Sequence, residues 1–236
     1  MIKRIKKLDV IYNGDLLIDD VTEKKVKEVW NEFIKGKKAC EFYDGDIYCV
    51  TKIDDFVPLI DVSKTKYSCL IYAKETNNLT IRSFFSAGYI KTIDNYICII
   101  LNNRDSLNAI GGIADSRDII NNKLDYYSCF IREFKEELGI DIHDNANFEM
   151  MLKYLKYPSG KELEDAFYPV GTIYEIKTKY TKDELITIFN NSLHEDEVKE
   201  LKFYNVDNYK EIYLCNKIDY LGELFDIIFD GGIISE

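Results

Sequence analysis

The chain has little of several residue types that mark common protein classes. Of its 236 residues, three are proline, two are histidine and six are cysteine. The cysteines stand singly, with no Cys-X-X-Cys pair, so we expect small buried side chains in a reducing compartment instead of disulfides or a zinc site. They are Cys40, Cys49, Cys69, Cys98, Cys129 and Cys215.

Long hydrophobic runs are also missing. No apolar stretch approaches the roughly 18 residues that a membrane-spanning helix needs. The N-terminus, residues 1–7, is basic, but Asp9, Asn13 and Asp15 interrupt the segment after it, and this argues against a signal peptide or a membrane anchor. We therefore expect a cytoplasmic protein with no membrane partner.

Positive charge is scarce beyond the first seven residues. The chain has 31 Lys and Arg against 42 Asp and Glu, a net charge of −11. A protein that grips long nucleic acids needs a basic surface, so no long DNA or RNA partner is expected. Hydrophobic residues make up 46% of the chain, enough for a packed core in one large domain or a domain with an extension.

The most informative stretch is residues 132–140. On a helix, the spacing of Glu133, Glu136 and Glu137 puts all three carboxylates on one face, where they repel one another unless a cation lies among them. Oxygen ligands without His or Cys favour Mg²⁺ or Mn²⁺ over Zn²⁺. The alternative is an ordinary amphipathic helix, with Phe130, Phe134 and Leu138 toward the core and Gly139 ending it.

The sequence Arg132–Ile140 resembles the second half of the Nudix box, Arg-Glu-apolar-X-Glu-Glu-X-Gly-apolar. Gly111-Gly112 lies upstream, as in the family. In the family pattern the Arg follows the second glycine by about fourteen steps, whereas Arg132 follows Gly112 by twenty, so the loop is about six residues longer. Leu124 occupies the place of the first box Glu. The carboxylates nearby, none of them in register, are Asp115, Asp118 and Asp125.

The resemblance implies a set of roles. Glu136 and Glu137 would be ligands of Mg²⁺ or Mn²⁺, joined by the backbone carbonyl of Gly112. Glu133 would be either a third ligand or the base that accepts a proton from the attacking water. Arg132 would orient a glutamate through a charge-assisted hydrogen bond.

Nudix enzymes split the pyrophosphate bond of a nucleoside diphosphate linked to another group. The resemblance thus implies a metal-dependent pyrophosphohydrolase whose substrate is a small nucleotide derivative, with a nucleotide sugar or an ADP-ribose-like compound favoured. Two alternatives stay open: a Nudix-fold nucleotide-binding or regulatory protein without hydrolase activity, and an mRNA-cap hydrolase, against which the negative charge counts. The oligomeric state is open, with a homodimer among the alternatives.

Further candidates lie outside the box. Some members of the family take their general base from another loop, and two acidic segments fit: residues 158–165, where Glu164 is our candidate beside Glu162 and Asp165, and residues 194–197. Arg104 could pair with a phosphate. The candidates for stacking on a base are Tyr67, Tyr89 and Tyr168.

The resemblance implies an α/β/α Nudix sandwich with a mixed sheet over residues 86–236, extended by an N-terminal α+β module over residues 1–85. A weaker likeness joins the N-terminal part to Nudix proteins that hydrolyse UDP-sugars. It rests on Trp30, residues 42–45 and residues 65–67.

Local patterns predict the elements. We expect a hairpin within residues 9–20 that turns at Asn13-Gly14-Asp15, a helix over residues 22–35 capped by Thr22, and a hairpin of two strands over residues 67–73 and 79–85. Thr181 and Glu184 form a capping box for a helix over residues 181–190. Other strands are expected over residues 39–53, 56–62, 88–93, 96–101, 149–157, 167–177 and 201–206, with a closing helix over residues 217–229.

Overall fold

The computed structural model describes residues 1–36, 43–54, 57–121, 123–143, 145–159, 168–194, 196–208 and 219–229. Its helices are α1 (Asp20–Ile34), α2 (Tyr67–Thr76), α3 (Tyr126–Leu138), α4 (Lys182–Asn191) and α6 (Asp219–Phe229). Its strands are β1 (Ile2–Arg4), β2 (Asp9–Asp15), β3 (Asp46–Asp54), β4 (Leu59–Lys66), β5 (Arg82–Lys91), β6 (Tyr96–Asn102), β7 (Leu107–Asn108), β8 (Ile110–Ile113), β9 (Ile119–Ile120), β10 (Lys123–Leu124), β11 (Phe148–Lys156), β12 (Val170–Thr178) and β13 (Val198–Asn205).

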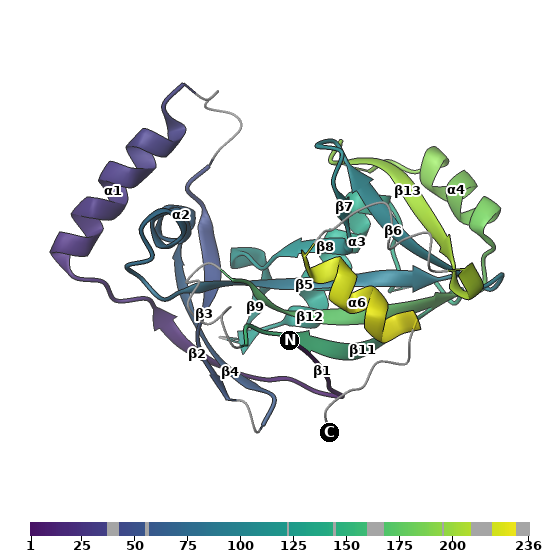
Figure 1. The fold of residues 1–236 in the computed structure, drawn as a ribbon, viewed down its shortest axis with the longest axis horizontal. Helices are drawn as coiled ribbons and strands as arrows, with labels where there is room; N and C mark the ends of the chain where they lie inside the picture. Colours follow the sequence, from purple (N-terminus) through teal and green to yellow (C-terminus); the bar gives the residue numbers. More distant parts are fainter. Residues whose placement is uncertain are drawn as a thin grey trace.

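Strand β5 connects the parts of a large mixed sheet (Figure 1). It runs parallel to β12 along most of its length, while its other edge pairs antiparallel with β3, then β8, then β6. Beyond β12 the sheet continues through β11 to β1, and beyond β3 through β4 to β2. The predicted border between residues 85 and 86 falls inside β5, and the division into two modules stays a prediction.

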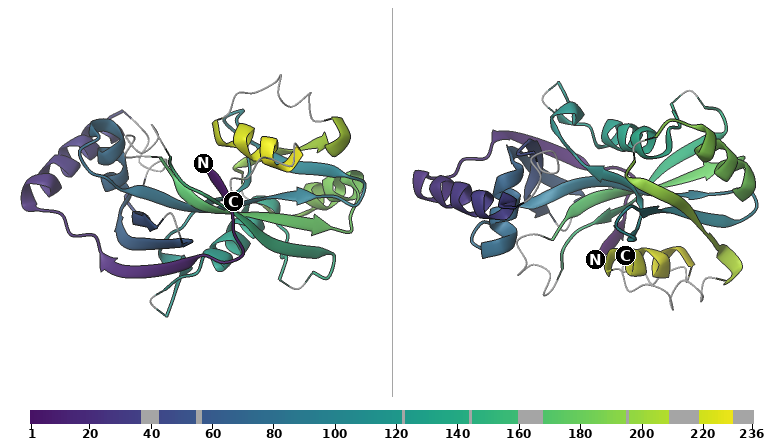
Figure 2. Two further views of the ribbon diagram at one scale, coloured as in Figure 1. Left: turned by 60° about the horizontal axis from the view of Figure 1, so that its bottom comes forward. Right: turned by 90° about the horizontal axis from the view of Figure 1, so that it is seen from above.

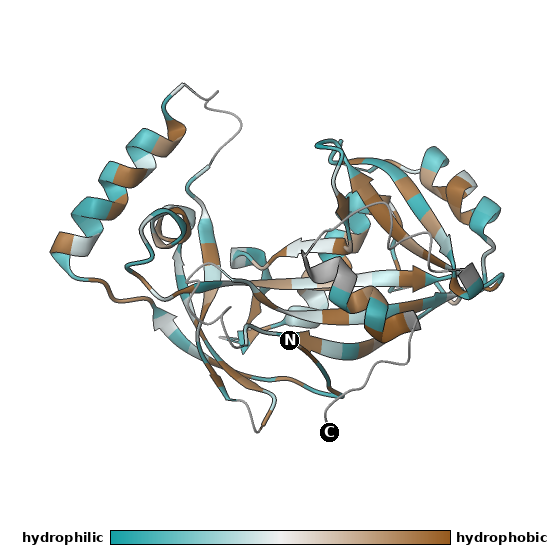
Figure 3. Cartoon of the chain, viewed as in Figure 1, coloured by the Kyte–Doolittle hydropathy of each residue, from teal (hydrophilic) through white to brown (hydrophobic). Residues whose placement is uncertain are grey.

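Helices cover both faces of this sheet. On one face Phe130 and Phe134 of α3 pack with α4 against Ile90 of β5. On the other face Leu224 and Phe225 of α6 pack against the neighbouring β5 residues, among them Tyr89. Successive side chains of a strand point to opposite faces, so the apolar run of β5 serves both cores. Figures 2 and 3 show α3 and α6 on opposite sides of the sheet and the apolar strands between them. The predicted α/β sandwich with a mixed sheet is confirmed.

The N-terminal region differs from its prediction in two places. Asn13 and Gly14 do not turn a hairpin: β2 stays extended and pairs parallel with β4, and the positive φ of Gly14 (78°) falls at a register shift between Tyr12 and Asp15. Residues 67–76 form helix α2 instead of a strand. Short apolar runs fit either structure, and residues 68–73 of this helix are all buried, which removes the amphipathic pattern that would have revealed it.

Helix α1 begins two residues earlier than expected. Asp19, not Thr22, is its cap, and the Asp19 carboxylate accepts the Thr22 N–H at 2.7 Å. The Trp30 ring packs edge-on against Tyr67 of α2, with 6.2 Å between ring centroids, so Trp30 belongs to the contact between α1 and α2. The Thr181–Glu184 capping box of α4 is confirmed.

The cysteines that the structure describes are buried free thiols, as expected: Cys49, Cys69, Cys98 and Cys129. Cys40 and Cys215 lie outside the described residues. Among the helices described, none is long and apolar enough to cross a membrane.

Candidate functional site

Helix α3 carries the glutamates of the motif. Its apolar side chains Phe130, Phe134 and Leu138 are fully buried, which fixes the helix against the sheet and turns the acidic face toward β8. The helix ends where Gly139 adopts a left-handed conformation (φ 67°) and donates its N–H to the Lys135 carbonyl at 2.8 Å. A side chain at Gly139 would collide with the Leu193 carbonyl. The predicted helix and its glycine stop are both present.

The glycine pair and the glutamates meet. Gly111 and Gly112 lie in β8, and the Gly111 N–H donates to Glu137 Oε2 at 2.6 Å. A Cβ atom added at Gly112 would overlap the Glu133 carboxylate. The absence of a side chain at Gly112 therefore lets this carboxylate lie against the backbone of β8, which is the proximity that the motif predicted.

Arg132 is the centre of a network of ion pairs. Its Nη1 donates to Glu133 Oε1 at 2.6 Å and to Glu136 Oε2 at 2.9 Å. Its Nε and Nη2 bind the two carboxylate oxygens of Asp118 at 3.1 and 2.8 Å, a bidentate pair. Burial would lower the pKa of Arg132, but its hydrogen bonds to the Asp118 carboxylate and the charge of Glu133 together raise that pKa above its usual value. Arg132 thus holds two of the predicted glutamates, as its assigned orienting role requires.

Asp118 was named from the sequence as a nearby carboxylate out of register, but no role was assigned to it. It is 1% exposed and ends a short 3₁₀ turn, Ser116–Asp118, where its carboxylate also accepts the Asp115 N–H at 2.9 Å. Counting back from Arg132 led to Leu124, eight steps before it, which is buried in an apolar cluster. The family pattern has fourteen steps from the second glycine to the Arg, so six steps separate that glycine from the first Glu. Counting six steps forward from Gly112 leads to Asp118. The extra residues form the β9–β10 hairpin after Asp118, so the two ways of counting disagree.

A second arginine lies at the outer side of this network. Arg117 Nη2 pairs with Asp115 Oδ2 at 2.7 Å and its Nη1 with Glu136 Oε1 at 2.8 Å. Its side chain is 57% exposed, against 15% for that of Arg132. Arg117 was not a sequence candidate, and Asp115 was named only as a nearby carboxylate out of register, because neither falls at a motif position.

The pKa of Glu133 is raised to about 7, because burial disfavours its charged form more than the neighbouring Arg132 charge favours it. Glu133 therefore takes up a proton more readily than an ordinary glutamate does. This behaviour suits a group that accepts a proton during a reaction.

The residues supply the right kind of ligand for a hard divalent cation. Five carboxylates and two guanidinium groups meet here, which gives an excess of three negative charges when all five carboxylates are ionised. They are Asp115, Asp118, Glu133, Glu136 and Glu137, with Arg117 and Arg132. Within the described part of the chain, no three Asp, Glu, His or Cys side chains already converge as metal ligands. The charges and oxygen donors fit a cation, which would take Glu136 and Glu137 from their present partners.

A cavity of about 580 Å³ opens beside this cluster. Gly111, Gly112 and Glu137 line one part of it, and Lys156 and Tyr168 line another. The cavity therefore joins the acidic site to a region with an aromatic ring and a cation.

Lys156 is a further residue that the sequence analysis did not select. It is 1% exposed, and its Nζ donates to the Tyr168 hydroxyl at 2.7 Å and to Glu223 Oε2 of α6 at 2.9 Å. Burial opposes its charge, but the hydrogen bonds that Lys156 donates to Tyr168 and Glu223 raise its pKa above the usual value, so Lys156 is cationic at neutral pH. Its signal in the sequence was a lone lysine within the apolar run Tyr154–Tyr157.

The other sequence candidates are dispersed. Arg104 lies exposed in the turn after β6, where its backbone N–H bonds Asn102 Oδ1, and it does not line the cavity. Glu164, together with Glu162 and Asp165, lies outside the described residues. Of the second acidic segment, Glu195 is also outside them, Glu197 lines the cavity, and His194 stacks on Phe189 with 4.2 Å between ring centroids.

The three tyrosine candidates lie in three different parts of the fold. Tyr168 lines the cavity. Tyr89 is buried and donates its hydroxyl hydrogen to Glu175 at 3.0 Å, on the face covered by α6. Tyr67 packs against Trp30, far along the chain from the site. Only Tyr168 is placed where it could contact a ligand held at Gly112.

Comparison with known proteins gives solved structures but no sequence match. No protein-family model matches the chain, and no curated protein matches it. Similar solved structures include a NUDIX hydrolase from Nitrosomonas europaea, with 12% identity over 64% of this chain and 90% of that one and a TM-score of 0.43. Others are the NUDIX domain of Shewanella oneidensis NrtR complexed with ADP ribose (9% identity, 69% and 96% coverage, TM-score 0.40) and an ADP-ribose pyrophosphatase from Streptococcus suis (12%, 65% and 94%, TM-score 0.36).

The solved structures that this chain resembles include Nudix proteins, the family that its motif also resembles.

Proposed function

We propose that the chain is a Nudix-type hydrolase that uses Mg²⁺ or Mn²⁺ to split the pyrophosphate bond of a small nucleoside diphosphate derivative. The observation that carries this proposal is the meeting of the Gly111-Gly112 pair with Glu133 and Glu137 beside a cavity, with Arg132 holding Glu133 and Glu136 in place. An amphipathic surface helix would need neither the glycine contact nor the buried arginine.

Each residue has a task in this proposal. Glu136 and Glu137 are metal ligands, with the Gly112 carbonyl as a further oxygen donor. When bound, the cation neutralises the phosphate charge and lowers the pKa of a water molecule. Arg132 orients Glu133 and Glu136 and is itself fixed by Asp118.

Glu133 is either a third ligand or the base. Its raised pKa and its place beside Gly112 support the role of a base that accepts a proton at its carboxylate. Glu164 stays as an alternative base from outside the motif.

The dimensions of the cavity support a small substrate. A volume of about 580 Å³ falls within the range of pockets that hold small molecules. We place the diphosphate beside Gly112 and Glu137 and the base or sugar toward Phe85 and Tyr168, whose rings could stack on it. Lys156 would then lie within reach of a polar group of the substrate. A nucleotide sugar or an ADP-ribose-like compound fits this layout, and the net charge of −11 argues against long nucleic acids.

The test is a screen of nucleoside diphosphate sugars, ADP-ribose and dinucleotides with Mg²⁺ or Mn²⁺, detecting released monophosphate. Glu136→Gln and Glu137→Gln should each lower turnover at least about a hundredfold while the protein stays folded, because a carboxamide keeps the volume but loses the ligand charge. Glu149→Gln, a strand residue away from the cluster, is the matched control. If both Glu136→Gln and Glu137→Gln kept full turnover, the assignment of these ligands would be wrong.

One observation favours a second candidate function. Glu133 and Glu136 are bound by arginines in the present arrangement, which would suit a nucleotide-binding sensor that does not hydrolyse its ligand. Calorimetry with ADP-ribose separates the two: a sensor would bind it with Mg²⁺ present and release no monophosphate, whereas a hydrolase would turn it over and lose this activity in EDTA.

A further inference from the structure

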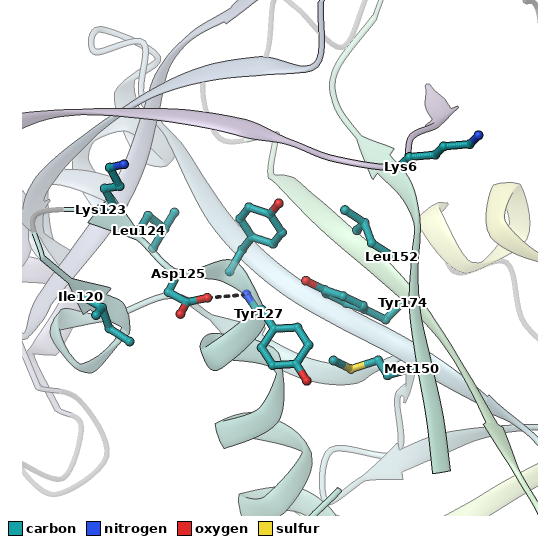
Figure 4. A pocket seen from close by; sticks show the side chains of 10 residues that line it. Lys6, Ile120, Lys123, Leu124, Asp125, Tyr127, Met150, Leu152 and Tyr174 are labelled. Atoms are coloured by element: carbon teal, nitrogen blue, oxygen red, sulfur yellow. Dashed lines mark hydrogen bonds between the residues drawn. The ribbon is translucent and has the colours of Figure 1, made fainter. Parts of the chain in front are cut away.

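A second cavity, of about 460 Å³, lies at the N-terminal end of α3 (Figure 4). Its wall is made by the β9–β10 hairpin, the first residues of α3 and the facing strands β11 and β12. It shares no lining residue with the cavity at Gly112. The residues that lengthen the chain between Asp118 and Arg132 thus form part of this second cavity, through Ile120, Lys123 and Leu124.

One polar atom of this cavity lacks a partner. Tyr174 is 2% exposed, and its hydroxyl makes no hydrogen bond to any described residue. Its ring stacks on Phe130, with 4.8 Å between ring centroids, and in Figure 4 its hydroxyl points into the space toward Asp125. A buried hydroxyl without a partner is costly, so a molecule that offers an acceptor at this point would be stabilised there.

Two polar groups beside the hydroxyl, the Asp125 carboxylate and the Tyr126 hydroxyl, are already engaged. Asp125 caps α3 by accepting the N–H groups of Tyr127 and Ser128 at 3.1 and 3.0 Å. The Tyr126 hydroxyl donates to the Leu8 carbonyl at 3.1 Å. The Tyr174 hydroxyl can therefore donate a hydrogen bond, and the described residues around it supply no acceptor.

The charge at this point selects against anions. Burial raises the pKa of Tyr174 far above its usual value, and Tyr126 and Asp125 raise it further, so the hydroxyl keeps its proton and acts as a donor. The Asp125 carboxylate already occupies the N-terminus of α3, which leaves no anion position there. Lys6 and Lys123 lie at the rim, and Figure 4 shows the Lys6 amino group pointing away from the cavity.

The walls favour a flat apolar body. Aromatic rings and soft aliphatic side chains face the cavity, among them Tyr126, Met150 and Leu152. Thioether and aromatic groups pack well against aromatic ligands. The volume is that of a small ligand site.

We propose that this cavity binds a neutral, planar heteroaromatic molecule, whose ring nitrogen or carbonyl oxygen accepts a hydrogen bond from the Tyr174 hydroxyl. The site is separate from the proposed hydrolase centre, and its occupation does not depend on catalysis. Asp125 donates its N–H to the Asp118 carbonyl at 2.8 Å, so the segment that lines this cavity is joined directly to the partner of Arg132.

Quinoline and naphthalene are the probes, because they share two fused rings and only quinoline carries an acceptor. Each is titrated into the full-length ¹⁵N-labelled protein, and the amide signals of Tyr127 and Ser128 report on the cavity. We expect quinoline to shift these amides saturably, and Tyr174→Phe to weaken quinoline binding about fivefold, the value of one hydrogen bond. Naphthalene binding should not change in Tyr174→Phe.

Two variants complete the experiment. Tyr127→Phe makes the same chemical change on a tyrosine whose hydroxyl points away from Tyr174 in Figure 4, and it should leave quinoline affinity unchanged. Met150→Trp fills the cavity and should abolish the binding of both probes. The proposal is overturned if Tyr174→Phe binds quinoline as tightly as the unmodified protein, if the shifts gather at Gly111 and Gly112 instead, or if no saturable shift occurs up to the solubility of quinoline.

Discussion

The two ends of α3 differ in whether their buried polar groups have hydrogen-bond or ion-pair partners. Toward its C-terminal end, every carboxylate of the cluster has a partner: Arg132 binds Asp118, Glu133 and Glu136, and the Gly111 N–H binds Glu137. At its N-terminal end, the Tyr174 hydroxyl is buried with no partner among the described residues. The same helix thus separates a fully paired ionic network from a neutral cavity with one open position.

The difference follows from the cost of burying each kind of group. An unpaired buried charge costs several kcal/mol, whereas an unpaired hydroxyl costs about 1–3 kcal/mol. A folded protein can therefore tolerate an unpaired buried hydroxyl but not an unpaired buried charge. We therefore expect substitutions to differ in effect according to whether they uncover a charge, strain the backbone or remove a neutral group.

The largest effect is expected when Arg132 is removed. Arg132→Met would leave Asp118, whose side chain is 2% exposed, as an unpaired buried charge, and should lower the free energy of unfolding by about 4 kcal/mol. Arg132→Lys should recover only part of this loss, because an ammonium group cannot form the bidentate pair. Urea unfolding in EDTA measures both values.

The matched control is Arg117→Met. Arg117 makes similar ion pairs, to Asp115 and Glu136, but its side chain is 57% exposed. Solvent screens such pairs, so the loss should stay below about 1 kcal/mol. Equal losses in the Arg117 and Arg132 variants would show that burial does not set the energies of this network.

The two neighbouring glycines give the next comparison. A side chain at Gly111 would overlap the backbone of Ser86 and Ala87, and Gly111 has a φ of 138°, so Gly111→Ala should cost about 3 kcal/mol. The nearest atoms that a side chain at Gly112 would meet are those of the Glu133 carboxylate, which can rotate away, so Gly112→Ala should cost about 1 kcal/mol.

The effect of Gly112→Ala on activity should be much larger than its effect on stability. Gly112→Ala displaces Glu133 from the proposed site, so on the proposed function it should lose most of its turnover despite its mild effect on folding. Thermal unfolding and the monophosphate assay, run on the same two variants, check this. A Gly112→Ala protein with normal turnover would argue against a role for Glu133 beside the backbone of β8.

Features set by neighbouring residues could be predicted from the sequence. Helix α3 with its stop at Gly139, the Thr181 cap of α4 and the contact between Gly112 and the glutamates each depend on residues close in the chain or on one short motif. Helix α2 could not be predicted, because its burial comes from α1 and β3, which removes the periodic pattern.

Features set by distant contacts were missed. Asp118 pairs with Arg132 across an inserted hairpin, so spacing within the motif could not locate it. Lys156 owes its charge and position to Tyr168 and Glu223, and the latter lies 67 residues further along the chain. Such partners depend on the tertiary fold, which a single sequence does not display.

The one gain in stability is expected at Tyr174, at the neutral end of α3. Tyr174→Phe keeps the ring that stacks on Phe130 and removes only the unpartnered hydroxyl, so the free energy of unfolding should rise, by about 1 kcal/mol. Tyr89→Phe is the contrasting variant, since the Tyr89 hydroxyl donates to Glu175 at 3.0 Å, and this change should lower stability instead. If the Tyr174 hydroxyl has no partner, urea unfolding should show changes in the free energy of unfolding of opposite sign for the two variants. A loss of stability in Tyr174→Phe would mean that a group of the protein or a bound water already satisfies the hydroxyl, and the contrast between the two ends of α3 would then disappear.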